Sequence, residues 1–189
     1  MSAGILYLHG FCSSRASRKA RLLAEAMADR GLGSQFFCPA LSPVPALAIE
    51  QASALLVTAD PEVTLVGSSL GGLYATVLAE RLGRRALLVN PAVGIAGHES
   101  LLVGWHENFY TGASFEFTRE HAAQLIDLER MAITPANYQL WAEQGDEVLD
   151  WQRAVARYAG CVQRVFPGGD HSFTRFGEML PQLFEFCGL

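Results

Sequence analysis

Apolar residues along the chain fall into two kinds of pattern. Some form short runs of strand length, without a polar residue at every second position. Others recur every three or four residues over longer segments, as on the buried face of a helix. Continuous apolar runs are typical of strands buried on both faces of a parallel sheet. The predicted strands are Gly4–Leu8, Gln35–Cys38, Val63–Gly67, Ala86–Asn90, Tyr138–Glu143 and Val162–Phe166.

Helical patterns separate most of these runs. The segment Ser17–Arg30 is rich in Ala, Leu, Arg and Glu, and Gly31 is suited to end a helix there. The other predicted helices are Ala46–Val57, Leu70–Leu82, Thr118–Met131, Leu149–Tyr158 and Phe176–Phe186. Alternating strands and helices predict an α/β fold with a doubly wound parallel sheet. Such folds place their chemistry in loops beyond the carboxyl ends of the strands, here after Leu8, Gly67, Asn90, Glu143 and Phe166.

One long segment, residues 93–134, interrupts this alternation. It contains no convincing strand, but it is rich in glycine and aromatic residues before its helical part. Because long structureless loops are uncommon in compact domains, we predict a cap insertion within a single domain that spans residues 1–189. Its aromatic residues either pack in the cap or line an acyl pocket, and the two alternatives are equally supported. The candidate pocket residues are Trp105, Phe109 and Tyr110, with Phe115 as a further candidate.

Composition narrows the class of partner. The chain has 189 residues, of which 50% are hydrophobic and 17% charged, so one domain with a sizeable core is expected. The net charge of -5 argues against nucleic acid or an anionic membrane as the main partner and favours a small-molecule substrate. No signal peptide and no apolar stretch long enough to span a membrane is visible, which predicts a cytoplasmic protein. The oligomeric state stays open.

The cysteines predict no disulfide framework. They are scattered and form no Cys-x-x-Cys pair, so buried, reduced thiols are expected, with a disulfide or a pocket thiol as the alternative. The four positions are Cys12, Cys38, Cys161 and Cys187.

The sharpest chemical signal is the segment Gly67-Ser68-Ser69-Leu70-Gly71-Gly72, which follows a predicted strand and opens a predicted helix. A strand-to-helix elbow needs small residues around a crowded turn, and it exposes the side chain of its central residue at the helix N-terminus. The pattern alone is only moderately specific, and its strand-then-helix context strengthens it. We therefore predict Ser69 as a nucleophile and Ser68 as a packing neighbour.

A serine hydroxyl needs a base, and His171 is the best candidate. It follows the last predicted strand within Gly168-Gly169-Asp170-His171, so that nucleophile, acid and base occur in the chain order typical of this arrangement. The alternative is a solvent-exposed turn histidine. The less suitable histidines are His9, which precedes the nucleophile, His98 and His106 in the insertion, and His121 in a helical run.

Asp146 is predicted to orient the histidine. It follows the strand Tyr138–Glu143 at once, and Gly145 permits a tight turn there. Glu147 and Asp150 compete for this role. Asp170, next to His171 in sequence, is better suited to a turn or capping role.

An oxyanion formed on the substrate needs backbone donors. The amide of Leu70 directly follows the nucleophile, and the loop after the first strand should supply the second donor. We nominate the Phe11 amide for this role and expect His9 to be a structural residue of the same turn.

Basic residues crowd the start of the first predicted helix, where the helix dipole disfavours positive charge. The simpler interpretation is that these residues form a solvated helix face. The alternative is that they form a site that attracts an anionic group such as a CoA phosphate. The cluster consists of Arg15, Arg18, Lys19 and Arg21.

Several motifs together carry a family resemblance. They are Tyr7-Leu8-His9-Gly10-Phe11 with Ser13-Ser14, Gly67-Ser68-Ser69-Leu70-Gly71-Gly72, Asn90-Pro91-Ala92, Tyr110-Thr111-Gly112, Gly145-Asp146-Glu147-Val148-Leu149-Asp150 and Gly169-Asp170-His171. Over nearly its whole length the chain resembles the YqiA-like bacterial esterases of the α/β-hydrolase superfamily. The elbow occurs throughout that superfamily, whereas the Asn-Pro-Ala and Gly-Asp-Glu-Val pieces are more specific.

The resemblance implies a three-layer α/β-hydrolase fold with a truncated, mostly parallel sheet of about six strands and a small cap. It also implies a triad of Ser69, Asp146 and His171, no metal or organic cofactor, and hydrolysis of acyl esters or acyl-CoA thioesters. Two other function classes stay open. One is a hydrolase of another bond, such as an amide, lactone or carbon-carbon bond, and the other is a non-catalytic binding protein on the same scaffold.

Overall fold

A six-stranded sheet forms the centre of the molecule. The computed structural model describes residues 4–58 and 62–189. The strand order is β2-β1-β3-β4-β7-β8, and every neighbouring pair is parallel. The predicted α/β fold is therefore confirmed. The strands are β1 (Gly4–Leu8), β2 (Phe36–Phe37), β3 (Val63–Ser68), β4 (Ala86–Val89), β7 (Tyr138–Glu143) and β8 (Val162–Phe166).

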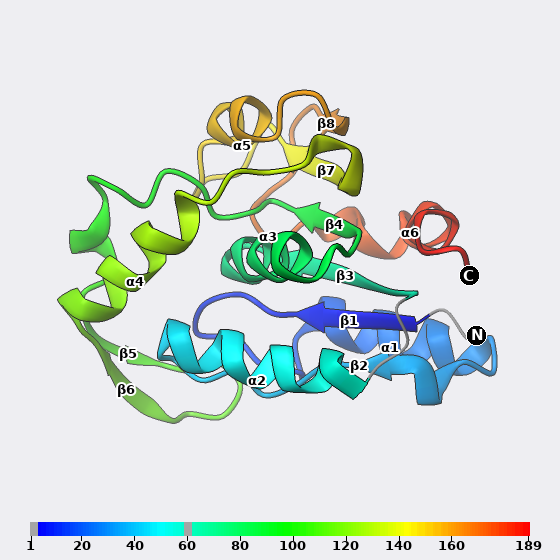
Figure 1. Cartoon of the computed structure of the whole chain (residues 1–189), viewed down its shortest axis with the longest axis horizontal. Coiled ribbons are helices and arrows are strands. Elements are labelled where there is room, and N and C mark those ends of the chain that lie inside the picture. Colours follow the sequence, from blue (N-terminus) through cyan, green and yellow to red (C-terminus); the bar gives the residue numbers. More distant parts are fainter. Residues whose placement is uncertain (1–3, 59–61) are drawn as a thin grey trace.

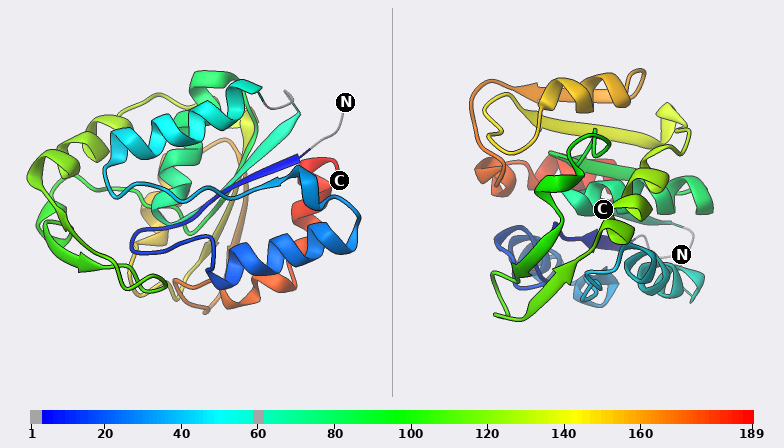
Figure 2. Two further views of the ribbon diagram at one scale, coloured as in Figure 1. Left: turned by 90° about the horizontal axis from the view of Figure 1, so that it is seen from below. Right: turned by 90° about the vertical axis from the view of Figure 1, so that its left-hand side faces the viewer.

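Helices cover both faces of this sheet, which runs between two helical layers in the left view of Figure 2. Helices α1 and α6 share one buried cluster with the sheet, and α2, α3, α4 and α5 share the other. The helices are α1 (Arg18–Asp29), α2 (Pro45–Thr58), α3 (Leu70–Leu82), α4 (Arg119–Glu129), α5 (Trp151–Arg157) and α6 (Leu180–Cys187). The last one begins later than predicted, because residues 174–177 form a separate 3₁₀ turn before Pro181.

Strand β1 shows why its apolar run is continuous. Leu6 and Leu8 enter the cluster on one face of the sheet, whereas Ile5 and Tyr7 enter the cluster on the other. Successive side chains of a strand point to opposite faces, so a strand covered on both sides needs apolar residues throughout.

Residues 93–134, here called the cap, leave the sheet after β4 and return at β7. They contain an antiparallel hairpin of β5 (Gly104–Glu107) and β6 (Ser114–Phe117), followed by α4. The expectation that this segment holds no strand was wrong. Each strand has only four residues and includes polar side chains, so the sequence pattern is too short to be distinctive. In Figure 1, β1 points to the left, and the hairpin lies at that side, beyond the carboxyl edge of the sheet.

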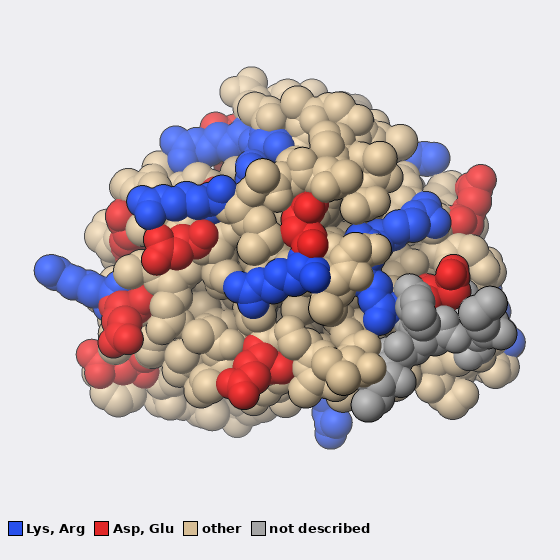
Figure 3. Space-filling view, in the orientation of Figure 1, with Lys and Arg blue, Asp and Glu red and all other residues tan. Residues whose placement is uncertain are grey.

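The face of the molecule seen in Figure 3 is not strongly charged over its described residues. On the side shown in Figure 3, cationic and anionic side chains are interspersed among uncharged ones. None of the helices in the described ranges combines the length and the apolar character needed to cross a bilayer.

Candidate active site

Ser69 lies in the tight turn between β3 and α3. Its backbone has φ 56° and ψ -125°, a conformation that non-glycine residues rarely adopt. The turn is possible because glycines in it let neighbouring segments of the backbone approach closely. A Cβ on Gly71 would lie 2.6 Å from the His9 carbonyl oxygen, and one on Gly72 would lie 2.7 Å from the Pro91 Cβ. Ser69 makes no side-chain capping bond to the helix, so its hydroxyl is available for other partners.

The structure brings Ser69, His171 and Asp146 together in series. The Nε2 atom of His171 lies 3.1 Å from the Ser69 Oγ. Its Nδ1 atom lies 2.9 and 3.1 Å from the two carboxylate oxygens of Asp146. The three residues follow β3, β8 and β7, so they meet at the carboxyl edge of the sheet. Three distant parts of the chain thus form the hydrogen-bonded geometry of a serine triad.

The surroundings of Asp146 keep it anionic. Its side chain is 2% exposed, and one carboxylate oxygen accepts the amides of Val148 (2.9 Å) and Leu149 (2.8 Å). Burial alone would raise the pKa, but the hydrogen bonds from His171 and these amides outweigh it, so the pKa lies below its usual value. A carboxylate can only accept, so it fixes the proton on Nδ1 and leaves the Nε2 lone pair facing Ser69.

The competing acids have other partners. Glu147 accepts the backbone amide of His171 at 3.0 Å, and this bond lowers the pKa of Glu147. The side chain of Asp150 caps α5 by accepting the Gln152 amide at 2.9 Å. Asp146 is therefore the acid that the geometry favours.

The loop after β1 closes the other side of Ser69. A Cβ on Gly10 would lie 3.1 Å from the Ser69 Cβ and 3.5 Å from its Oγ, so this loop lies directly against the serine. His9 holds the loop, with Nδ1 3.1 Å from the Gly10 carbonyl and Nε2 3.4 Å from the Leu41 amide. Burial lowers the pKa of His9, which favours a neutral, structural histidine. The oxyanion roles of the Phe11 and Leu70 amides stay predictions.

An apolar pocket of about 350 Å³ opens beside this loop. Gly10, Phe11 and Leu70 line it, and Leu41, Pro43, Tyr74 and Phe115 contribute further apolar surface. Part of its wall comes from the cap, which is joined to the loop after β1 where the Asn108 side chain donates to the Ser13 carbonyl (2.7 Å) and the Phe109 amide to the Cys12 carbonyl (2.9 Å).

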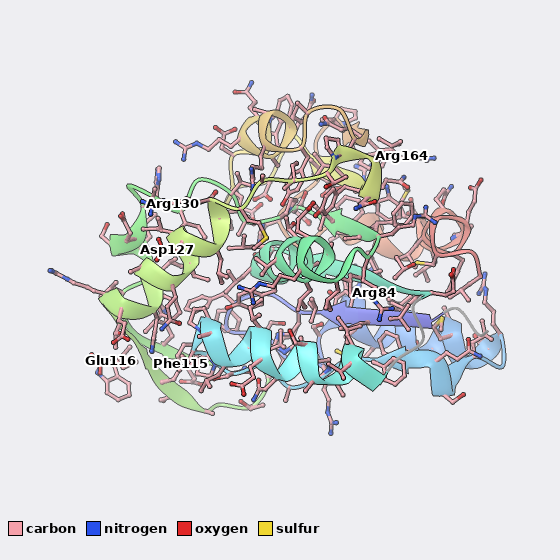
Figure 4. All side chains as sticks on the ribbon, viewed as in Figure 1. Arg84, Phe115, Glu116, Asp127, Arg130 and Arg164 are labelled. Carbon is pink, nitrogen blue, oxygen red and sulfur yellow. The ribbon has the colours of Figure 1, made fainter. Side chains whose placement is uncertain are left out.

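Of the four aromatic candidates for the pocket, Phe115 lines it and the other three lie elsewhere. Trp105, Phe109 and Tyr110 are 73%, 81% and 48% exposed, and none of them lines this pocket. Residues alternate between the two faces of a strand, so Trp105 faces outward opposite Glu116, whereas Phe115 faces inward. Figure 4 shows Phe115 and Glu116 side by side on the hairpin. The Phe115 ring packs edge-on against Phe11, with centroids 5.7 Å apart.

Two members of the basic cluster hold the loop that follows His171. Arg18 donates to the Thr174 carbonyl at 2.9 Å, and Lys19 donates to the Ser172 carbonyl at 2.7 Å. Burial lowers the pKa of Lys19 to about 8. Arg15 and Arg21 are exposed. This arrangement supports a structural role for Arg18 and Lys19.

The fold defines the class of protein: helices on both faces of a parallel sheet, with a serine at the turn from β3 to α3, form the architecture of the α/β-hydrolase superfamily. Within that class, the chain belongs to the uncharacterised protein family UPF0227, whose family model matches residues 4–188. This confirms the YqiA-like resemblance identified from the motifs.

Solved structures show the same fold at low sequence identity. A putative hydrolase from Agrobacterium vitis S4 is 18% identical, with a TM-score of 0.71, and the match covers 97% of this chain and 87% of that one. Alpha/beta hydrolase domain-containing protein 10 from mouse is 18% identical, with a TM-score of 0.70 and coverage of 98% and 89%. Est1E from Butyrivibrio proteoclasticus, in complex with ferulic acid, is 12% identical, with a TM-score of 0.65 and coverage of 96% and 86%.

Proposed function

We propose that the protein is a serine hydrolase that cleaves carboxylic esters or thioesters through an acyl-enzyme. The observation that carries this proposal is the unbroken series from the Ser69 hydroxyl to the His171 imidazole to the Asp146 carboxylate. The first distance, 3.1 Å, is short enough for direct proton transfer from serine to imidazole. The buried carboxylate stabilises the imidazolium that this transfer creates.

The reaction has two halves. The Ser69 Oγ attacks the carbonyl carbon while His171 Nε2 takes its proton, and the amides of Leu70 and Phe11 stabilise the oxyanion. His171 then protonates the leaving alcohol or thiol as the C–O or C–S bond breaks. In the second half, water attacks the acyl-Ser69 ester, its proton passes through His171 back to the serine oxygen, and a carboxylic acid leaves.

The pocket supports an apolar substrate group. Its wall carries aromatic and aliphatic side chains and begins at the residues nominated for the oxyanion site, Phe11 and Leu70. Gly10 and Leu70, which lie against Ser69 and directly after it, line this pocket, so we infer that a group bound there presents its carbonyl to Ser69. Est1E, which shares this fold, was solved with ferulic acid bound. We therefore propose esters or thioesters of short or compact apolar acyl groups as the substrate class.

The test uses a fluorophosphonate probe and nitrophenyl esters of increasing chain length. Wild-type protein is expected to be labelled once and to hydrolyse esters, and Ser69→Ala is expected to abolish both. Asp146→Asn should lower kcat by about 10³- to 10⁴-fold, because the histidine loses its fixed tautomer. Ser68→Ala, a buried neighbour outside the triad, is the matched control and should keep activity.

Labelling or turnover that persists in Ser69→Ala would contradict the proposal. Labelling of Ser69 without turnover of any ester would favour a hydrolase of another bond. No labelling and no turnover in the wild type would favour a non-catalytic binding protein.

A further inference from the structure

A buried carboxylate lies beneath the loop that carries His171. We propose that Glu143, together with Asn90 and Arg175, positions this loop so that the imidazole stays within reach of Ser69. None of these three residues, here called the brace, lines the pocket, so they are positioning residues. The inference rests on the proposed function, in which His171 is the base.

Glu143 ends β7 and its side chain is 0% exposed. One carboxylate oxygen accepts the Arg175 Nε at 2.5 Å, and the other accepts the backbone amide of Asp170 at 2.6 Å. Arg175 follows His171 by four residues and Asp170 precedes it by one. The carboxylate therefore ties together the two ends of the segment that carries the imidazole.

Asn90 holds the same loop from β4. Its side-chain amide donates to the carbonyls of Asp170 (3.0 Å) and His171 (3.3 Å), and its oxygen accepts the Glu143 amide at 2.9 Å. Asp170 is thus held through both its amide, by Glu143, and its carbonyl, by Asn90. Asn90 directly follows β4, and its backbone has φ 41°, a conformation that is uncommon for residues other than glycine.

Glycines let the loop lie directly on this carboxylate. Gly169 has φ 80°, and a Cβ there would overlap the Glu143 carboxyl group. A Cβ on Gly145 would lie 2.5 Å from the Gly169 carbonyl oxygen. The backbone before His171 therefore follows the shape of the brace closely, and a small change in the brace moves the loop.

Stability alone is a poor reason for a charge at this position. Removing an ion pair from water costs several kcal/mol, and well-packed apolar residues are often as stable or more stable. The brace instead fixes the direction of the loop, since three of its hydrogen bonds end on backbone atoms of Asp170 or His171 and a fourth joins Glu143 to Arg175. Catalytic groups need such support, because a misplacement of about 1 Å lowers rates by about 100-fold.

The variant Glu143→Gln tests the brace with little change in shape. Two donors, Arg175 Nε–H and the Asp170 amide, face the carboxylate, whereas a glutamine offers one oxygen and turns its NH₂ group toward one of them. We expect kcat per titratable active site to fall by about 10- to 100-fold, with KM within about twofold, because the pocket is untouched. Titration with the fluorophosphonate counts the folded, competent sites.

Glu80→Gln is the matched control. Glu80 also accepts several hydrogen bonds, from the Thr134 amide and hydroxyl and from the Tyr138 hydroxyl, but it does so at the opposite end of β7. It should lose stability and keep kcat per titratable site. Arg175→Lys is the second brace variant. It keeps the positive charge on a partly exposed side chain but loses the Nε–H donor, so kcat should fall by less than in Glu143→Gln.

A second readout needs no substrate. The proton shared between His171 Nδ1 and Asp146 is expected to give a downfield proton NMR resonance, which should broaden or vanish in Glu143→Gln and persist in Glu80→Gln. This resonance tests the role of the brace even if the wild type hydrolyses no ester. The brace and the proposed ester hydrolysis can therefore fail separately. Wild-type kcat and an unchanged resonance in Glu143→Gln and Arg175→Lys would overturn the inference, as would an equal loss of kcat per site in Glu80→Gln.

Discussion

Ser69 shows how a single residue depends on its neighbours. Its positive φ is unfavourable for a side chain with a Cβ, and such strain persists only where the surroundings hold it in place. The surroundings here are backbone atoms. The turn before α3 lies so close to the loop after β1 that residue 71 cannot carry a Cβ without displacing that loop.

The first prediction follows from this contact. Gly71→Ala should lower the free energy of unfolding by about 3 kcal/mol and reduce fluorophosphonate labelling, because the new Cβ forces the β1 loop away from Ser69. Gly33→Ala is the control. Its Cβ would meet nothing nearer than 3.7 Å, so stability should stay the same or rise by up to about 1 kcal/mol. Urea denaturation measures both, and equal effects would contradict the argument.

At this scale the sequence identified the three candidate residues that the structure brings together, but not the residues that support them. Ser69, Asp146 and His171 could be predicted because each follows a predicted strand, and such loops share one edge of a parallel sheet. Glu143 was predicted only as the last residue of a strand. Its signal was a carboxylate at the end of an otherwise buried run, but the partner Arg175 lies 32 residues away, and nothing local indicates that pairing.

Among the elements, the sheet was predictable and the cap hairpin was not. All six strands of the sheet have observed boundaries within one residue of the prediction at each end. Strands β1, β3, β4 and β7 are buried throughout, so their sequences are continuous apolar runs that are easy to recognise. Strand β2 is shorter than expected. The hairpin has one face on the pocket and one exposed, so its apolar residues alternate over four positions only, and tertiary contacts with Phe11 decide its structure.

The two faces of this hairpin give the second prediction. Phe115→Ala should enlarge the pocket and raise kcat/KM for octanoyl relative to butyryl esters, on the order of tenfold. Trp105→Ala removes an aromatic ring from the opposite, exposed face and should leave this ratio unchanged. Nitrophenyl esters of graded length provide the measurement. A shift in Trp105→Ala without one in Phe115→Ala would indicate instead that the acyl group binds on the exposed face of the hairpin.

The far end of β7 gives the third prediction. Partial burial alone would raise the pKa of Glu80, but the hydrogen bonds from Tyr138 and Thr134 outweigh it and lower the pKa below the ordinary value. Glu80→Gln should therefore cost about 1 to 3 kcal/mol at neutral pH. The difference from wild type should be full above the unfolded-state pKa and should shrink as the pH falls through the folded-state pKa.

Denaturation curves at a series of pH values from neutral to acid check this sign. Glu116→Gln, at an exposed carboxylate on the hairpin (Figure 4), is the control and should change stability little at any pH. A Glu80→Gln difference that is independent of pH would show that the hydrogen bonds do not depend on the charge of Glu80.

At the scale of the whole molecule, one sheet separates two buried clusters and belongs to both. Leu140 of β7 enters the cluster with α2 and α3, whereas its neighbour Trp141 enters the cluster with α1 and α6. Neither helical layer can leave without exposing half of the side chains of each central strand. Unfolding of one helical layer alone would therefore be costly. We expect both layers to unfold together with the sheet in a single transition.

Thiol labelling provides the fourth prediction. All four cysteines are free, and Cys187 is buried in the cluster with α1 and α6, where burial raises its pKa to about 12. A cysteine introduced by Ala154→Cys would report on the other cluster, where Ala154 is 3% exposed. Both thiols should become reactive at the same urea midpoint, because opening either layer requires the shared strands to separate. Two distinct midpoints, resolved by mass spectrometry of the labelled peptides, would show instead that the sheet keeps one cluster intact while the other opens.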